Sequence, residues 1–191
     1  MGLKVFCISS TVNWQEIIDR FYGEEETELK KLLLAHSEAV AQKALSVADR
    51  HPELKLDRLF LADAAMLHDI GIIECHAPGI YCNGWAPYIC HGMIGSRMLT
   101  WSGVEHRYAR VCARHTGAGL TCNDIVSQHL PLPPVSLLPE TLEEQVICYA
   151  DKFYSKSHPE QEKTIEQAIR SLQKFGDEGV ERFKKWVVMF E

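Results

Sequence analysis

The side chains best suited to chemistry in this chain are four histidines and two aspartates set in largely apolar surroundings. They are His36, the adjacent pair His68 and Asp69, His91, His115 and Asp151. A buried imidazole needs a partner, and Asp is rarely buried unpaired, so a bound cation would satisfy both residue types. Imidazole and carboxylate ligands suit iron, manganese, zinc or nickel better than magnesium or calcium. The sequence therefore predicts a buried centre for divalent transition metal.

Length and charge limit the class of protein. The chain has 191 residues, of which 46% are hydrophobic, and a formal net charge of −6. These values are typical of one globular domain, and without a run of Lys and Arg the charge favours a small substrate over a nucleic-acid polymer. No apolar run approaches the roughly 20 residues of a membrane-spanning helix, and the segment 4–8 is too short for a signal peptide. We therefore expect a cytoplasmic protein that does not act at a membrane.

The seven cysteines have no CxxC spacing, which indicates reduced thiols rather than a disulfide framework. Cys75, Cys82 and Cys90 lie near His76 and His91, so a zinc site is one interpretation. Their spacing fits no structural zinc module, and the alternative of core and loop thiols is favoured.

Hydrophobic periodicity predicts a nearly all-helical chain. Helices are expected over residues 13–22, 24–50, 57 to about 69, 88–101, 104–115, 122–129, 141 to about 155, 160–174 and 177–190. Ser9, Ser10 or Thr11 is a candidate cap for the first helix, Pro52 ends the second, and Gly71 is placed to end the third.

Two segments between these helices are expected to be irregular. Residues 74–87 contain two prolines and two glycines and predict an ordered loop or lid, with no convincing strand pattern. Residues 130–139 carry four prolines, which lack the amide hydrogen that a helix needs. Directly afterwards, Thr141 and Glu144 have the spacing of a capping box, so a helix should begin there.

The ligand-type residues, with the string HDIG at 68–71, resemble the HD superfamily of metal-dependent phosphohydrolases, and most closely its single-domain HDIG branch. The resemblance covers about residues 31–155 and includes the phrases HGMIGSRML from His91, ARHTGAGLT from Ala113 and PETLEEQVICYADK from Pro139. It implies an all-α bundle, with a single HD domain over 1–191 and a core at about 25–156. A short helix would precede this core, and C-terminal helices would either close the bundle or form the face of a homodimer.

The resemblance also implies how the six residues divide between one or two metal ions. One ion would be bound by His36, His68, Asp69 and Asp151. In members with two ions, Asp69 would bridge to a second ion held by His91 and His115. The implied activity is hydrolysis of a small phosphorylated metabolite or nucleotide by a metal-activated hydroxide, with Asp69 at the reacting centre.

Such a site also needs positive charge to offset that of the phosphoryl group. Arg97 and Arg114 are the best candidates, because they lie close in sequence to His91 and His115, although both also fit as ordinary surface residues. The segment 117–119, Gly-Ala-Gly, could present backbone amides to a phosphate, and a helix-ending turn explains it equally well.

Departures from better-known relatives leave the substrate open. Ile72 follows HDIG where many relatives have lysine, and Thr116 replaces the second histidine of the HD-GYP relatives, which argues against cleavage of cyclic dinucleotides. Residues 115–119 loosely resemble the HT-x-G phrase of the bacterial diadenosine-tetraphosphate hydrolases of this superfamily, so a dinucleoside polyphosphate stays an alternative substrate. Two other classes also stay open: a mixed-valent di-iron oxygenase of the HD type, and a non-catalytic metal- or ligand-binding sensor module.

Overall fold

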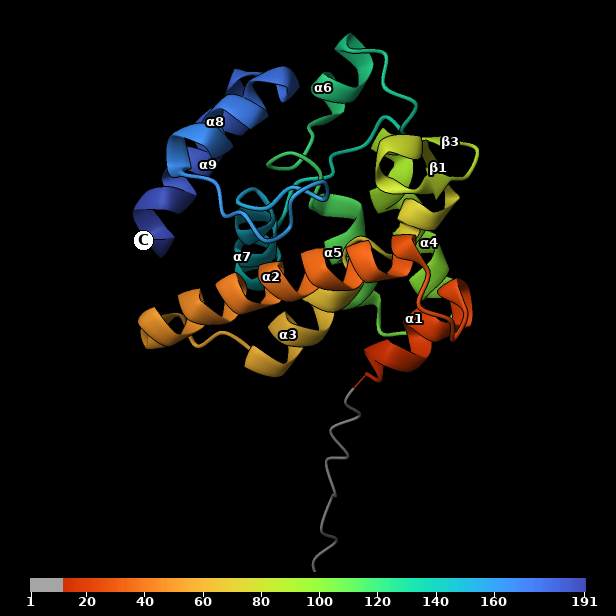
Figure 1. The fold of residues 1–191 in the computed structure, drawn as a ribbon. Coiled ribbons are helices and arrows are strands. Elements are labelled where there is room, and N and C mark those ends of the chain that lie inside the picture. Colours follow the sequence, from red (N-terminus) through yellow and green to blue (C-terminus); the bar gives the residue numbers. More distant parts are fainter. Residues whose placement is uncertain (1–11) are drawn as a thin grey trace, which may run out of the picture.

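Five helices surround one apolar core in the computed structural model, which describes residues 12–191 (Figure 1). They are α2 (Glu28–Arg50), α3 (Arg58–Leu67), α4 (His91–Trp101), α5 (His106–Arg114) and α7 (Leu142–Asp151). Helix α2 packs against α3 and α7, and α4 packs against α5. Along α2 the buried residues Leu33, Val40, Ala44 and Val47 recur every three to four positions, so one side of the helix faces the core. The predicted all-α fold is confirmed.

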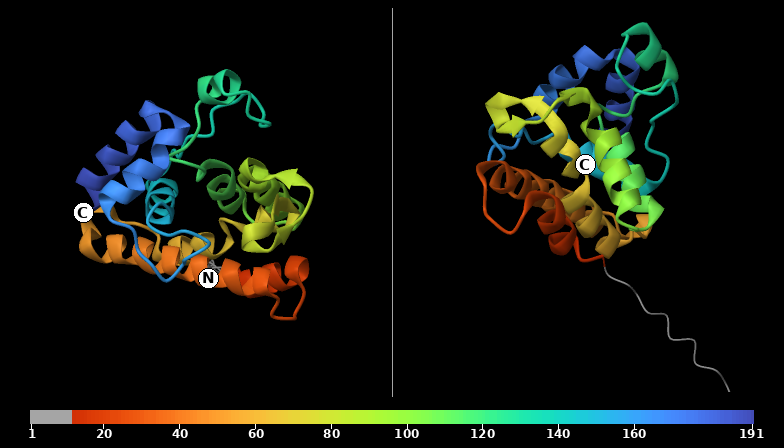
Figure 2. Two further views of the ribbon diagram at one scale, coloured as in Figure 1. Left: turned by 45° about the horizontal axis from the view of Figure 1, so that its top comes forward. Right: turned by 90° about the vertical axis from the view of Figure 1, so that its right-hand side faces the viewer.

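The remaining helices lie around this core. They are α1 (Trp14–Tyr22), α6 (Cys122–Ser127), α8 (Ile165–Leu172) and α9 (Asp177–Phe190). Helices α8 and α9 pack together beside α7 (Figure 2), and the rings of Phe183 and Phe190 lie 5.4 and 5.3 Å from that of Tyr149. The C-terminal helices therefore close the bundle, while a homodimer face on them stays a prediction. Within residues 12–191 no helix is both long and apolar enough to cross a membrane.

Capping side chains set helix ends that the periodicity placed only approximately. Helix α2 begins at Glu28 rather than 24, because the Thr27 hydroxyl accepts a hydrogen bond from the Lys30 amide at 3.2 Å. The capping box of Thr141 is present as predicted, but α7 already ends at Asp151, and α8 begins after the Thr164 cap rather than at 160. Helix α1 is capped by Asn13, and the candidate caps at 9–11 lie outside the described residues.

The segment 74–87 contains a small sheet, so the expectation of no strands was wrong. Strand β1 (Cys75–Ala77) pairs antiparallel with β2 (Cys82–Asn83) and parallel with β3 (Ala86–Pro87). Strands of two or three residues are too short for an alternating pattern to be recognised. Short 3-10 helices precede, interrupt and follow the sheet at Ile70–Glu74, Pro78–Ile80 and Tyr88–Cys90, and others lie at Pro52–Leu54 and Gln173–Phe175.

The cysteines near this sheet are thiols of the core and loops. The Cys75 and Cys82 side chains donate to backbone carbonyls at 3.6 Å, and burial raises their pKa values to about 12 and about 11. Within residues 12–191, neither group of residues that could hold a metal ion contains a cysteine. The geometry therefore favours the core-thiol interpretation over a zinc site.

Gly71 does not end helix α3, as the sequence had suggested. The helix stops at Leu67, and Gly71 lies inside the 3-10 helix that follows it. The missing side chain of Gly71 instead allows the first turns of α4 to approach the segment that carries Asp69.

Candidate metal centre

The six ligand-type side chains meet in one buried cluster. The structure forms two groups whose ligand atoms lie within 4.8 Å of one another, and Asp69 belongs to both. One group consists of His36, His68, Asp69 and Asp151, and the other of Asp69, His91 and His115. Each of these residues exposes 8% of its surface or less.

Five helices position the cluster, and in four of them the ligand lies at or directly beside an end of the helix. His36 lies inside α2, and the pair at 68 and 69 directly follows α3. His91 is the first residue of α4, His115 follows the last residue of α5, and Asp151 is the last residue of α7. Helix ends allow side chains from several directions to meet without breaking the packing between the helices.

Asp69 is the centre of the arrangement. Its Oδ2 atom lies 3.2 Å from Nε2 of His36 and 3.1 Å from Nε2 of His68. Its Oδ1 atom lies 3.4 and 3.3 Å from the Nε2 atoms of His91 and His115. Each carboxylate oxygen therefore faces a different group, as a carboxylate bridging two ions would.

The far nitrogens of three imidazoles contact backbone carbonyls. The Nδ1 atoms of His68, His91 and His115 lie 2.6, 2.7 and 2.8 Å from the carbonyl oxygens of the residues three positions earlier. A carbonyl can only accept, so each Nδ1 donates, and Nε2 is the atom left to bind a metal. The Nε2 atoms of His91 and His115 face each other at 2.9 Å. Two lone pairs that face each other repel unless a cation lies between them, so this pair fits a metal site.

Charge and burial in the cluster also suit a metal. Both oxygens of Asp69 are buried without a hydrogen bond of good geometry. Burial opposes ionisation, yet His68 and Lys156 hold the pKa of Asp69 well below its usual range. Burial lowers the pKa of His91 to about 3, which favours the neutral form that binds metals. Burial opposes the charge on His68 too, but the two aspartates outweigh it and raise its pKa to about 9, so a metal would displace that proton.

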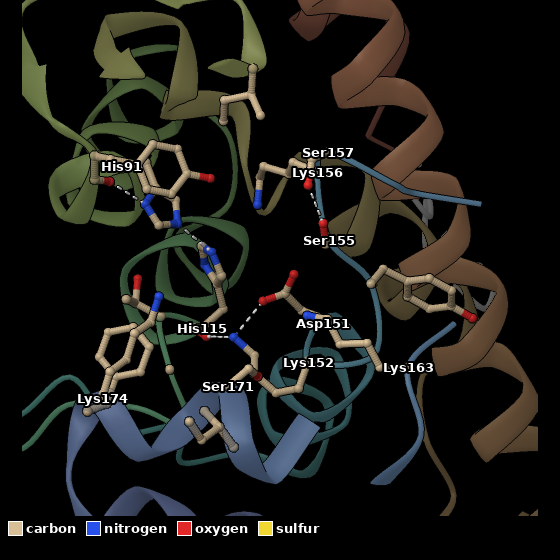
Figure 3. A pocket seen from close by; sticks show the side chains of 17 residues that line it. His91, His115, Asp151, Lys152, Ser155, Lys156, Ser157, Lys163, Ser171 and Lys174 are labelled. Atoms are coloured by element: carbon tan, nitrogen blue, oxygen red, sulfur yellow. Dashed lines mark hydrogen bonds and ion pairs between the residues drawn. The ribbon is translucent and has the colours of Figure 1, made fainter. Parts of the chain in front are cut away.

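A cavity of about 290 Å³ opens beside the cluster (Figure 3). His91, His115 and Asp151 form part of its wall. Four lysines also line it: Lys152, Lys156, Lys163 and Lys174. Because predicted ligands line this cavity, it is where a substrate would meet bound metal.

Lys152 and Lys156 are site residues that the sequence analysis missed. The ammonium group of Lys152 lies 2.6 Å from Oδ2 of Asp151, and that of Lys156 lies 2.5 Å from Oδ2 of Asp69. Their closeness in sequence to the last ligand was an available signal. Because α7 ends at Asp151, the chain after it turns back over the cavity, which a helix continuing to 155 would not do.

The two arginines expected at the site lie elsewhere. Arg97 is exposed and lines a separate cavity with Trp85 and Trp101. Six helical residues at about 100° each place it far around α4 from His91. The guanidinium of Arg114 lies 2.5 Å from Glu140 and donates to the carbonyl of Leu138 at 2.6 Å. Neither arginine lines the cavity beside the cluster, and the lysines supply the positive charge there.

The other residues that the sequence singled out lie in a turn, in the cavity wall or in the core. The carbonyl oxygens of Ala118 and Gly119 accept hydrogen bonds from Arg182 at 2.7 and 3.3 Å. The segment 117–119 is therefore a turn whose carbonyl groups are bound by an arginine. Gly117 and Thr116 line the cavity. Ile72, which occupies the position of a lysine in many relatives, is buried in the core, and Lys156 provides the charge beside Asp69.

The sequence pattern that defines the HD domain family matches residues 33–156. The chain belongs to the HD domain family. The match contains all six residues of the cluster and also Lys152 and Lys156, whereas Lys163 and Lys174 lie beyond its end.

Several relatives of this HD domain protein match it over only part of their own length. A tRNA (cytidine(56)-2'-O)-methyltransferase of Picrophilus torridus is 34% identical over 65% of the chain and 32% of its own length. A protein of the same name from Thermoplasma volcanium is 26% identical over 80% of the chain and 40% of its own length. An uncharacterised protein of Methanocaldococcus jannaschii is 33% identical over 63% of the chain and 62% of its own length. The chain thus spans a third to under two thirds of these relatives, and no solved structure matches it.

Proposed function

We propose that this HD domain protein is a metal-dependent phosphohydrolase that acts on a small phosphorylated metabolite or nucleotide. The observation that carries the proposal is the placement of Asp69, whose two oxygens face two ligand groups next to a lysine-lined cavity. The donor set of neutral imidazole and anionic carboxylate supports one or two divalent transition-metal ions, iron, manganese, zinc or nickel.

When bound, a pair of such ions would lower the pKa of water and polarise a phosphoryl group. The chain's own residues would position these ions. Asp69 contributes to both ligand groups, and the backbone carbonyls that accept from Nδ1 of His68, His91 and His115 fix the direction of their Nε2 atoms. Lys156 and Lys152 place ammonium groups at the edge of the cavity, where they would offset the charge that develops on the phosphoryl oxygens.

The four lysines of the cavity support an anionic substrate, which a phosphoester is. An oxygenase would use the same ligand set and could also take an anion, so the requirement for dioxygen is what distinguishes it from the hydrolase. Methyl transfer belongs to the names of two relatives of which the chain spans only 32% and 40%, and we do not extend it to this chain. The cavity of about 290 Å³ fits a small molecule, which supports a small substrate over a nucleic-acid polymer.

The experiment is turnover with defined metals in the absence of oxygen. Protein loaded anaerobically with manganese, nickel or cobalt is given a panel of phosphomonoesters and phosphodiesters, and released phosphate or alcohol is measured. We expect turnover that needs metal but no dioxygen and that is lost in Asp69→Ala, with Lys185→Met as an unaffected control. Turnover found only with iron and dioxygen would establish the oxygenase instead, and metal binding without turnover of any ester in the panel would count against the hydrolase.

A further inference from the structure

One wall of the cavity comes from the part of the chain after the HD match. That match ends at residue 156, but Lys163, Ser171, Leu172, Lys174 and Phe175 also line the cavity. These residues belong to the loop before α8, to α8 itself and to the 3-10 helix Gln173–Phe175 that follows it. The cavity therefore has a metal-ligand side from the family core and a second side particular to this C-terminal extension.

The lysines on the two sides differ in how they are neutralised. Lys152 and Lys156 pair with Asp151 and Asp69. For Lys163 and Lys174, by contrast, no carboxylate in the described part of the chain lies within ion-pair distance. Figure 3 shows Lys163 and Lys174 on opposite sides of the cavity, with Lys152 between them beside His115 and Asp151. Two positive charges without partners thus face the same cavity.

The surroundings of Lys163 make its charge costly unless an anion is present. Burial lowers the pKa of Lys163, and the nearby ammonium groups of Lys152, Lys156 and Lys174 add to the effect, while Asp151 opposes it. An anion between Lys163 and Lys174 would relieve this repulsion.

Both lysines sit on backbone that the fold holds in place. The amide of Lys163 donates to the carbonyl of Phe153 at 2.8 Å, and the capping box of Thr164 begins α8 directly afterwards. The ammonium group of Lys174 lies 5.0 Å from the centre of the Phe175 ring. That ring packs so closely on Gly117 that a Cβ there would lie 3.2 Å from it. The C-terminal wall is therefore fixed to the metal-ligand side.

We propose that Lys163 and Lys174 form a second anion subsite, so that the substrate carries a second phosphate or carboxylate group besides the phosphoryl group held at the metal centre. The role of the phosphoryl group at the metal centre rests on the proposed function. The role of the second anionic group rests only on the unpaired lysines of the C-terminal wall, and it restricts the substrate class to small molecules with two anionic groups.

The test is binding of non-hydrolysable probes to manganese-loaded protein, followed by calorimetry. Propylphosphonate carries one anionic group, propane-1,3-bisphosphonate carries two phosphonates, and 3-phosphonopropionate carries one phosphonate and one carboxylate. The variants are Lys163→Met and Lys174→Met. The matched control is Lys185→Met, which removes the same charge from an exposed position on α9 outside the cavity. Metal content and thermal unfolding of each variant are measured alongside.

We expect at least one of the two-anion probes to bind roughly tenfold tighter than propylphosphonate, the usual scale of a charge-assisted contact. The better probe tells phosphate from carboxylate. Each cavity variant should lose most of this preference and keep its metal and its affinity for propylphosphonate, whereas the control should keep the preference. Equal binding of all three probes to the parent protein, or an unchanged preference in both variants, would overturn the subsite. The two proposals fail separately, because a preference lost in the variants upholds the subsite even if the ester panel shows no turnover.

Discussion

A Cβ atom added to Gly71 would lie 2.2 Å from the carbonyl oxygen of His91. It would also lie 2.4 Å from the amide nitrogen of Gly95, one turn further along α4. Both neighbours are backbone atoms and cannot rotate away, so the contact fixes how closely α4 approaches the segment after Asp69. The glycine of the HDIG string thus sets the distance between the two ligand groups by packing, without a positive φ.

Replacing Gly71 with alanine should therefore damage both stability and the metal centre. The methyl group must push α4 away, and overpacking of this kind costs about 1–3 kcal/mol. We expect a lower free energy of unfolding in urea and fewer metal equivalents, because His91 moves with the helix. Gly79→Ala is the matched control, since nothing lies within 4 Å of a Cβ built there. If Gly71→Ala unfolds at the same urea concentration as the control, the packing argument fails.

The ligand variants should separate the two metal positions. Because Asp69 belongs to both ligand groups, Asp69→Ala should remove most of the bound metal. His91→Ala and His115→Ala should remove only the equivalent held by the second group. Elemental analysis of protein purified without oxygen measures this, with His106→Ala on the surface of α5 as the control. Full occupancy in Asp69→Ala would contradict the shared role of this carboxylate.

The sequence predicted the helical bundle and the meeting of the six ligand-type residues because both leave local marks. Buried residues on α2 recur at helical spacing, and a histidine such as His36 on that apolar side needs a partner. The HD string and its flanks added the family order. Periodicity was enough for the helices, since each such signal lies within one helix, whereas the grouping of residues from five helices around the metals was implied by the family resemblance.

The lysines of the cavity could not be predicted in the same way, because their positions depend on the path of a loop. Whether Lys156 meets Asp69 depends on where α7 ends and how the chain turns afterwards. The expectation for Arg97 and Arg114 failed for a related reason. Nearness in sequence to a ligand fixes neither the side of the helix on which an arginine lies nor the partner, such as Glu140, that binds it.

Removing the charge of Lys156 should separate metal binding from turnover. Its ammonium group lies 2.5 Å from Oδ2 of Asp69, where it offsets a ligand's charge and faces the cavity. In Lys156→Met, metal should bind at least as well, because a competing cation is gone. The value of kcat/KM for a phosphoester found by the panel should fall by about 1.5–3 kcal/mol, the range for a hydrogen bond to a charged group. Loss of metal together with activity would show instead that Lys156 only supports the fold of the site.

The carboxylate of Glu140 should make stability depend on pH in acid. It lies 2.7 Å from Arg110 and 2.5 Å from Arg114, and these guanidinium groups lower its pKa to about 2 from the usual 4.5. A lowered pKa in the folded state stabilises the protein at pH values above the unfolded pKa, and this contribution is lost as the pH falls from 4.5 toward 2. Glu140→Gln should thus be less stable than the parent at pH 7, with the difference shrinking through this range and in high salt. Urea unfolding from pH 7 to pH 3 with a chelator present measures the difference, and Glu26→Gln, an exposed position without an ion pair among the described residues, is the control. A difference between Glu140→Gln and the parent that stays constant from pH 7 to pH 3 would mean that the two arginines do not stabilise the ionised carboxylate.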